Sequence, residues 1–190
     1  MIDWLNQLDT RVFLFLNGLH SPGADQLMWW FTKGWIWAPL YLVFLIVLWK
    51  KLRTKIWVAI VAIILLVAIT DQTSVRFFKN PVQRLRPSHN PQLTGQVHTV
   101  NGYKGGKFGF ISSHAANTFG IALLLALLVR RKWFSLTLLG WAALMSYSRI
   151  YLGVHYPGDI FCGMLWGMLL ALGVYYLARL LLRDPKPQPV

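Results

Sequence analysis

The sequence predicts an all-α protein: a polytopic membrane helical bundle of five to six transmembrane helices, with interfacial helices at its N-terminus. Of the 190 residues 56% are hydrophobic and ten are Trp, and the mean hydropathy is +0.48, which is too apolar for an ordinary soluble domain. The apolar residues form long unbroken runs, which fit membrane helices and not the alternating pattern of a membrane barrel. The charged residues gather at the ends of these runs.

Residues 1 to 34 are predicted to form interfacial helices. From residue 2 to 18, apolar side chains recur at helical spacing among polar ones, so this helix is too polar to span a bilayer comfortably. The turn formers of Asn17 to Asp25 break it, and Ser21 with Pro22 opens a short aromatic helix. An interfacial aromatic belt is expected from Trp29, Trp30, Trp35 and Trp37.

Residues 35 to 183 form the predicted membrane-embedded domain. It contains five apolar segments, several of them shorter than the roughly 20 residues that a full span needs, so flanking residues must extend them. The polar connection from residue 79 to 112 is long enough to be functional, and the proline-rich tail, 184 to 190, is predicted to be disordered. The apolar segments are Trp35 to Trp49, Ile56 to Phe78, Ala115 to Val129, Trp133 to Tyr147 and Ile160 to Leu182.

The charge balance favours anionic partners. The formal net charge is +13, from 19 Lys and Arg against six Asp and Glu, and in an apolar chain this surplus suits anionic lipid headgroups. Nucleic acid is not an expected partner, because the bases sit at the ends of apolar segments and not in a soluble basic module. Cys162 is the only cysteine, which excludes an intrachain disulfide and a cysteine-based metal site.

Two tight basic connections, Lys50 to Lys55 and Arg130 to Lys132, fall on one side of the predicted bundle, and the polar connection falls on the other. The bases divide almost equally between the two sides, so the positive-inside rule favours one orientation only when bases with a predicted site role are set aside. On that basis the tight connections are cytoplasmic, and the opposite end faces the periplasm or exterior.

Three polar stretches at this opposite end carry residues suited to phosphate chemistry. They read K-N-P-V-Q-R-L-R-P from residue 79, S-S-H from residue 112 and S-R-I-Y-L-G-V-H-Y-P-G-D from residue 148. Ionisable groups at the ends of membrane spans are costly and therefore usually functional. Lys79, Arg86 and Arg149 would neutralise the charge on the oxygens of a phosphoryl group. Ser112 and Ser113 begin a predicted helix whose free N–H groups would point at an anion.

The predicted catalytic group consists of His155, His114 and Asp159. A carboxylate bonded to one ring nitrogen of His155 would fix its tautomer and stabilise the imidazolium formed on attack, so His155 is the predicted nucleophile. His114 would protonate the leaving oxygen, and the rate should be bell-shaped in pH because one imidazole must be neutral and the other protonated. No metal or other cofactor is expected, since the carboxylates are few and scattered and three fixed cations supply the positive charge.

In chain order the motifs are K-x6-R-P, S-S-H and S-R-x5-H-x3-D. They resemble those of the type 2 phosphatidic acid phosphatase (PAP2) superfamily, which includes lipid phosphate phosphatases and, on a related core, vanadium haloperoxidases. The first and third motifs match at every specified position. The second departs from the family's P-S-G-H, because Ile111 and Ser113 stand where Pro and Gly are usual. The resemblance implies a phosphohistidine on His155, which water hydrolyses after His114 has switched from acid to base.

The predicted function is removal of phosphate from a lipid phosphate or diphosphate by a bacterial inner-membrane enzyme. Undecaprenyl pyrophosphate is the first choice of substrate. Lipid A phosphate, phosphatidylglycerol phosphate and phosphatidic acid are rivals, as is phosphotransfer to another lipid. A rival of another class is a non-catalytic carrier of anionic lipids, but it leaves His114, His155 and Asp159 without a purpose. A haloperoxidase is a weaker rival, because those enzymes are soluble.

Other polar residues are interpreted as structural. Single bases at a membrane edge are usually anchors whose charged ends reach the interface, and lone histidines there are usually interfacial polar groups. Asp71, near the end of the second apolar segment, is expected to pair with Arg76 or Arg149. The expected anchors are Arg76, Arg84, Lys104 and Lys107, and the interfacial histidines are His20, His89 and His98.

Overall fold

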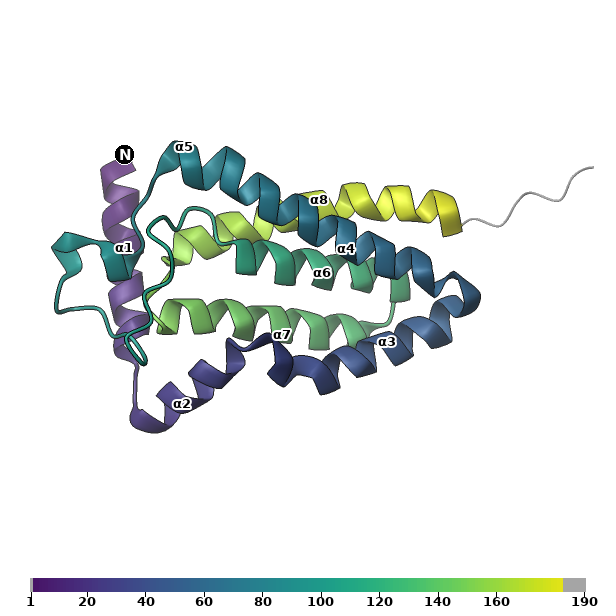
Figure 1. Ribbon diagram of the computed structural model, residues 1–190, viewed down its shortest axis with the longest axis horizontal. Coiled ribbons are helices and arrows are strands. Elements are labelled where there is room, and N and C mark those ends of the chain that lie inside the picture. Colours follow the sequence, from purple (N-terminus) through teal and green to yellow (C-terminus); the bar gives the residue numbers. More distant parts are fainter. Residues whose placement is uncertain (1, 183–190) are drawn as a thin grey trace, which may run out of the picture.

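The computed structural model describes residues 2–182, and over these residues the protein is helical with a single isolated β-bridge, between Leu85 and Phe108. The predicted all-α class is therefore confirmed. Five helices run side by side along the long axis of the molecule (Figure 1). They are α3 (Ala38–Leu52), α4 (Ile56–Thr73), α6 (Ser113–Val129), α7 (Lys132–Tyr151) and α8 (Pro157–Leu182).

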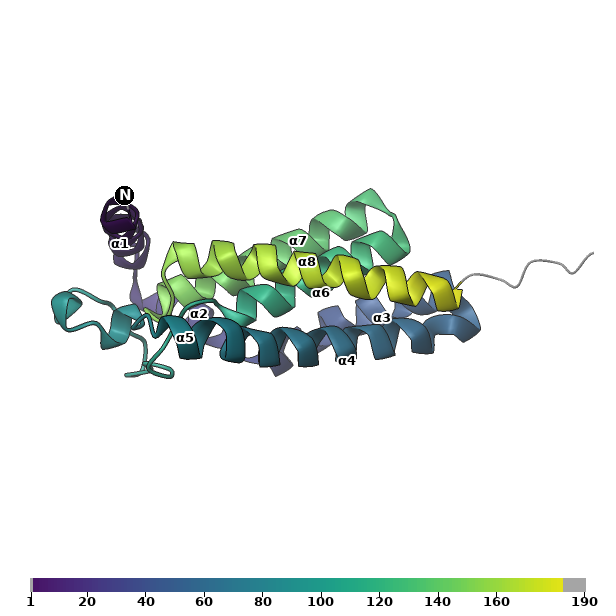
Figure 2. The same cartoon turned by 90° about the horizontal axis from the view of Figure 1, so that it is seen from above.

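The N-terminal region forms two helices at one end of this bundle. Helix α1 (Ile2–Gly18) runs across that end at a steep angle to the bundle axis, and Figure 2 shows it nearly end-on. Ser21 caps α2 (Pro22–Phe31) as predicted, because its hydroxyl oxygen accepts a hydrogen bond from the N–H of Ala24. The buried Phe13 and Asn17 hold α1 to the bundle. Its outer face exposes Trp4, Leu5, Leu8, Val12 and Phe15, an apolar surface that suits a membrane interface.

The apolar run from residue 34 to 82 is long and apolar enough to cross a membrane, and so is α8. The first run begins with a 3₁₀ turn (Gly34–Trp37) and reverses at Arg53, whose φ is 50°, so it supplies the two antiparallel helices α3 and α4. Helix α4 continues through a π-helical turn (Ser74–Lys79) into the short α5 (Asn80–Val82). Five or six membrane crossings remain a prediction.

The turns and the motif stretches lie at opposite ends of the bundle. The turn from α3 to α4 and the turn at Arg130 from α6 to α7 are at the end far from α1 (Figure 1). The ends of α5 and α7 and the starts of α6 and α8 are at the end that α1 covers. The predicted segregation of the basic connections from the motif stretches is therefore present in the fold.

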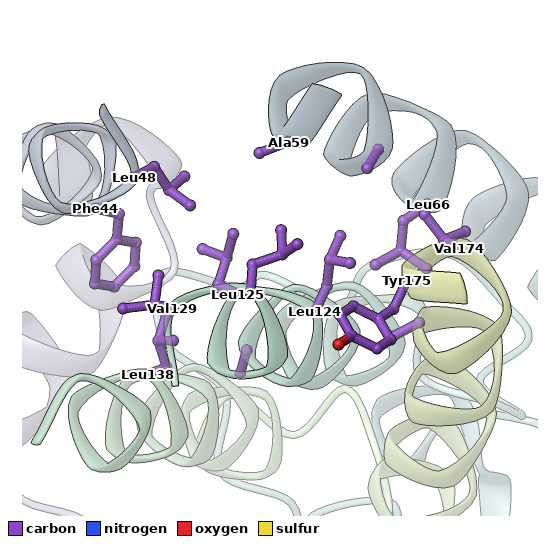
Figure 3. Close-up of a cluster of buried hydrophobic side chains, with 14 of the residues drawn as sticks. Phe44, Leu48, Ala59, Leu66, Leu124, Leu125, Val129, Leu138, Val174 and Tyr175 are labelled. Carbon is purple, nitrogen blue, oxygen red and sulfur yellow. The ribbon is translucent and has the colours of Figure 1, made fainter. Parts of the chain in front are cut away.

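Helix α6 is the centre of the hydrophobic core. Leu124, Leu125 and Val129 of α6 are buried among side chains from all four neighbouring helices (Figure 3). These include Phe44 and Leu48 from α3, Ala59 and Leu66 from α4, Leu138 from α7, and Val174 and Tyr175 from α8. Burial of apolar side chains on all sides of one helix fixes the positions of its ends relative to its neighbours.

Small residues let α6 and α8 cross in close contact. A side chain on Gly167 of α8 would collide with the backbone of Ala116, and a side chain on Gly120 of α6 would lie 2.9 Å from the carbonyl oxygen of Gly167. Close approach of backbones through small residues is a common way to pack membrane helices. This crossing places the start of α6 beside the start of α8.

We expect Gly167→Ala to destabilise the protein by about 1–3 kcal/mol, because the added methyl group forces α6 and α8 apart. Gly173→Ala is the matched control: it lies in the same helix, nothing lies within 4 Å of the added Cβ, and alanine should be neutral or stabilising by up to about 1 kcal/mol there. Thermal unfolding of both variants in detergent measures the difference. Equal stability of the two variants would contradict the close crossing.

Candidate active site

The three motif stretches meet at the end of the bundle that α1 covers. Each predicted site residue lies at the end of a helix or in a connection, where the bundle helices fix its backbone. Lys79 ends the π-helical turn after α4, Arg86 lies in the connection to α6, Ser112, Ser113 and His114 start α6, Arg149 is in the last turn of α7, His155 is in the turn before α8, and Asp159 is in the first turn of α8.

His155 and Asp159 form a buried pair. The Nδ1 atom of His155 lies 3.4 Å from Oδ2 of Asp159, and the two side chains are 1% and 0% exposed. The same carboxylate oxygen accepts a hydrogen bond of 3.0 Å from the N–H of Tyr156. Because Nδ1 faces the carboxylate, Nε2 of His155 is the nitrogen left for a substrate.

Burial lowers the pKa of His155 to about 4, and the cations Arg86 and Arg149 act in the same direction, while Asp159 opposes the shift. The imidazole is therefore neutral at neutral pH. A neutral imidazole has the free electron pair that a nucleophile needs.

Three cations surround this pair. Lys79 donates a hydrogen bond of 2.7 Å from Nζ to the Ser113 hydroxyl, and Arg86 donates one of 3.2 Å from Nε to the carbonyl of Phe108. The buried Arg149 donates from Nη2 to the hydroxyl of Tyr103, and its buried Nε has no partner among residues 2–182. That N–H is available to an anion, and a buried donor without a partner is unfavourable until it is bound.

The start of α6 separates the roles of the two serines. Ser112 is the N-cap: its hydroxyl oxygen accepts from the N–H of Ala115, and its own N–H donates to the carbonyl of Asp159 at 3.0 Å. Ser112 thus shapes the start of α6, and because its hydroxyl acts only as an acceptor in the cap, its O–H can still donate, so its contact with phosphate stays a prediction. Ser113 has no positive φ, which explains why a side chain fits where the family has Gly.

His114 lies in the first turn of α6 with its side chain exposed. It is close enough to His155, Arg149, Lys79 and Arg86 to interact with them electrostatically. The structure therefore brings together both predicted histidines and all three predicted cations.

The connection from residue 83 to 112 covers the pair. The N–H of Arg86 bonds to the carbonyl of Lys107, and the N–H of Gly109 bonds to the carbonyl of Arg84. A Cβ on Gly109 would lie 3.1 Å from Oδ2 of Asp159 and 3.5 Å from Nδ1 of His155. A side chain at this position would press on the buried carboxylate of Asp159, so glycine suits the close approach of the backbone. The sequence did not reveal this role, because Gly109 is one of several glycines in the connection.

Some structural interpretations from the sequence are wrong. Arg84, expected to be a membrane anchor, donates hydrogen bonds of 2.7 Å to both Asp159 and Asp9. Asp71 accepts from Asn117 of α6, which also contacts Thr70, and not from Arg76 or Arg149. An asparagine partner carries no charge, so a search for opposite charges could not find it.

The histidines of the N-terminal side also have partners within the fold. His98 lies 2.8 Å from Asp25 of α2 and stacks on His20 with ring centres 3.8 Å apart. His89 contacts the carbonyl of Gly105 through Nε2. These contacts hold the connection and α2 in place, so the three are more than interfacial polar groups.

A groove of about 940 Å³ opens beside the catalytic end, between α1 and the connection. Arg84 and Tyr156, which contact Asp159, form part of its wall. The side-chain amides of Asn6, Gln7 and Gln92 also line it, and they make no hydrogen bond to any other part of residues 2–182. Phe110 adds an aromatic surface.

The family model of the PAP2 superfamily matches residues 55–183, which contain all the predicted site residues. The chain belongs to the PAP2 superfamily. It is an integral membrane phosphatase of lipid phosphates, as the sequence predicts.

Its relatives include enzymes that act on different lipids. A lipid A 4'-phosphatase of Bacteroides thetaiotaomicron is 42% identical over all of this chain and 86% of its own length, and one of Porphyromonas gingivalis is 39% identical over 92% and 74%. An undecaprenyl-diphosphatase of Sulfolobus acidocaldarius is 28% identical over 84% and 73%.

Solved structures share the fold. Aquifex aeolicus LpxE superposes with a TM-score of 0.65 and 25% identity over 89% of this chain and 95% of its own. A phosphatidylglycerolphosphate phosphatase of Bacillus subtilis gives a TM-score of 0.70 at 20% identity, over 95% and 89%.

The acid limb of the pH profile tests the neutral state of His155. Because the pKa of His155 is lowered from 6.5 to about 4, the neutral form should persist on acidification, and kcat/KM should fall about tenfold per pH unit only below about pH 4. Steady-state kinetics in detergent from about pH 3 to 9 measure this, with circular dichroism at each pH as the control for folding. An acid limb near pH 6.5 would contradict the buried environment of His155.

Proposed function

We propose that this protein is a lipid A phosphatase that removes the 4'-phosphate of the lipid. The observation that carries the proposal is the similarity to two lipid A 4'-phosphatases at 42% and 39% identity over nearly the whole chain. The undecaprenyl pyrophosphate preferred from the sequence has less support, since the relative with that activity is 28% identical. Phosphatidylglycerol phosphate and phosphatidic acid remain alternatives.

The proposed reaction runs through His155. Its Nε2 attacks phosphorus while the bond from phosphorus to the sugar oxygen breaks, and the proton of His114 goes to that oxygen. The Nδ1–H of His155 is held by Asp159, which stabilises the positive charge that forms on the ring. Water then attacks the phosphohistidine, His114 takes a proton from it, and the phosphorus–nitrogen bond breaks to release inorganic phosphate.

Lys79, Arg86 and Arg149 would hold the phosphoryl oxygens during both steps. The free Nε of Arg149 and the N–H groups at the start of α6 would add donors. Three fixed cations and a helix N-terminus supply the charge stabilisation that phosphoryl transfer needs, so the proposed mechanism requires no metal ion.

The groove beside the site supports a substrate with a sugar headgroup. Amide side chains without partners in the protein, next to an aromatic ring, suit a carbohydrate because they can bind its hydroxyl groups while the ring packs on a sugar face. An isoprenyl diphosphate has no sugar hydroxyl groups, so it could use only the N–H donors of these amides and not their carbonyl acceptors.

We also propose that the protein lies in a bacterial inner membrane with the site facing the periplasm. The basic turns at residues 50–55 and 130–132 lie at the opposite end of the bundle, and basic connections favour the cytoplasmic side. The exposed apolar face of α1 would then rest on the periplasmic interface of the inner membrane.

A substrate panel tests the function. Purified protein should release phosphate from a bisphosphorylated lipid A faster than from undecaprenyl pyrophosphate, phosphatidylglycerol phosphate or phosphatidic acid. EDTA should leave the rate unchanged, and His155→Ala should lower it by about 10⁴-fold or more, because the nucleophile is lost. Mass spectrometry of the product should place the missing phosphate at the 4' position.

The other outcomes each identify a rival. Appearance of phosphate on an added acceptor lipid would indicate a phosphotransferase, and lipid binding without release would favour the carrier. In right-side-out spheroplasts added lipid should be dephosphorylated, whereas inside-out vesicles should leave it intact. The reverse pattern would overturn the proposed orientation.

The groove is tested separately. We expect the double substitution Asn6→Ala with Gln92→Ala to lower kcat/KM for lipid A about 30-fold, because about 1 kcal/mol is lost with each of two hydrogen bonds. Phosphatidic acid, which has no sugar, should be hydrolysed as before. Gln26→Ala is the matched control, an exposed amide of α2 outside the groove. An equal loss with both lipids would contradict a sugar-binding role.

A further inference from the structure

Arg84 bridges two carboxylates at the catalytic end and does not point at the phosphate site. Its Nη1 donates to Oδ1 of Asp159 and its Nη2 donates to Oδ2 of Asp9, both at 2.7 Å. The guanidinium also lies over the ring of Tyr156, 4.1 Å from its centre. Lys79, Arg86 and Arg149 differ from it, since none of them forms an ion pair with a carboxylate within residues 2–182.

The two oxygens of Asp159 have separate partners. Oδ2 faces Nδ1 of His155 and the N–H of Tyr156, and Oδ1 faces Arg84. A carboxylate bonded at both oxygens cannot rotate without breaking a charge-assisted hydrogen bond. Arg84 therefore fixes the plane of the carboxylate that orients His155.

Asp9 ties this arrangement to the N-terminal helix. Its Oδ2 accepts from Arg84, and its Oδ1 accepts a hydrogen bond of 2.7 Å from the N–H of Gly158 in the first turn of α8. A negative charge at a helix N-terminus is favourable, and a Cβ on Gly158 would lie 2.7 Å from Asp9. Helix α1 thus contacts the residue before Asp159 as well as the arginine that holds Asp159.

We propose that Arg84 is a positioning residue for His155, and that Asp9 of α1 holds Arg84 in place. The chain of contacts runs from Asp9 through Arg84 and Asp159 to the nucleophile. Helix α1 is on this view part of the catalytic framework in addition to being a membrane-contacting helix. The inference rests on the proposed role of His155 as the nucleophile.

The test compares Arg84→Gln with Arg76→Gln, a matched control on an exposed arginine with no partner in residues 2–182. The assay uses whichever lipid phosphate the wild type hydrolyses. Arg84→Gln should lower kcat about 10²-fold, since misplacing a reacting group by about 1 Å has an effect of this size, with KM changed less than about threefold. Competitive inhibition by inorganic phosphate, the product, should persist, because the three cations that bind its oxygens are intact.

Two further variants separate positioning from folding. Arg84→Lys keeps the charge but loses the planar fork by which Nη1 and Nη2 bond to separate carboxylates, so it should recover only part of kcat. Asp9→Asn, which leaves the bond between Arg84 and Asp159, should cause a smaller loss than Arg84→Gln. In an Asp159→Asn background, Arg84→Gln should cost less than about threefold, because groups that act together are not additive.

The outcomes are distinct. If Arg84→Gln resembles Arg76→Gln while His155→Ala is inactive, Arg84 does not position the nucleophile. If inhibition by inorganic phosphate is lost together with kcat, Arg84 is a phosphate ligand instead. Full additivity with Asp159→Asn would also overturn the inference. If His155→Ala keeps full activity, the proposed mechanism fails first, and this inference with it.

Discussion

The burial of Asp159 is the constraint on which the catalytic end depends. An ionised carboxylate with no exposed surface is very unfavourable unless it is paired and hydrogen-bonded. Its side chain is bonded to Arg84, to His155 and to the N–H of Tyr156, and its backbone carbonyl accepts from Ser112. The hydrogen bonds that stabilise this one buried carboxylate thus fix the positions of the turn before α8, the start of α6 and the connection that precedes α6.

This arrangement is possible because α6 and α8 touch at their backbones. With a side chain at Gly163 or Gly167, the start of α6 could not reach Asp159, since both positions face the α6 backbone. The core around α6 then holds the crossing rigid (Figure 3). Catalytic groups attached to helix ends of a rigid bundle keep their geometry without help from the lipid, which is the preorganisation that electrostatic catalysis requires.

The sequence predicts the catalytic residues better than it predicts the contacts between residues. Lys79, His155 and Asp159 could be found because phosphoryl transfer needs these residue types, and their spacing along helix ends brings them together. The ends of the helices were harder to predict. Ser148 looks like a polar break after an apolar run, but it lies inside α7 and is buried. Burial is possible because its hydroxyl donates a hydrogen bond to the carbonyl of Met145. Asp71 was assigned the wrong partner for a related reason, since an uncharged amide satisfies it.

The role of Arg84 could not be predicted from the sequence, because its partner Asp9 is 75 residues away in the chain. A single base near a helix end also resembles a membrane anchor. The residues that define the family and the residues of α1 that line the groove also lie in different parts of the chain. The family match begins at residue 55 and contains the phosphate chemistry, whereas Asn6, Gln7 and Asp9 of α1 precede it. The similarity to the Bacteroides enzyme covers the whole chain, α1 included. The groove joins these two parts of the chain, because Asn6 and Gln7 of α1 line it together with Gln92 and Phe110 of the matched part.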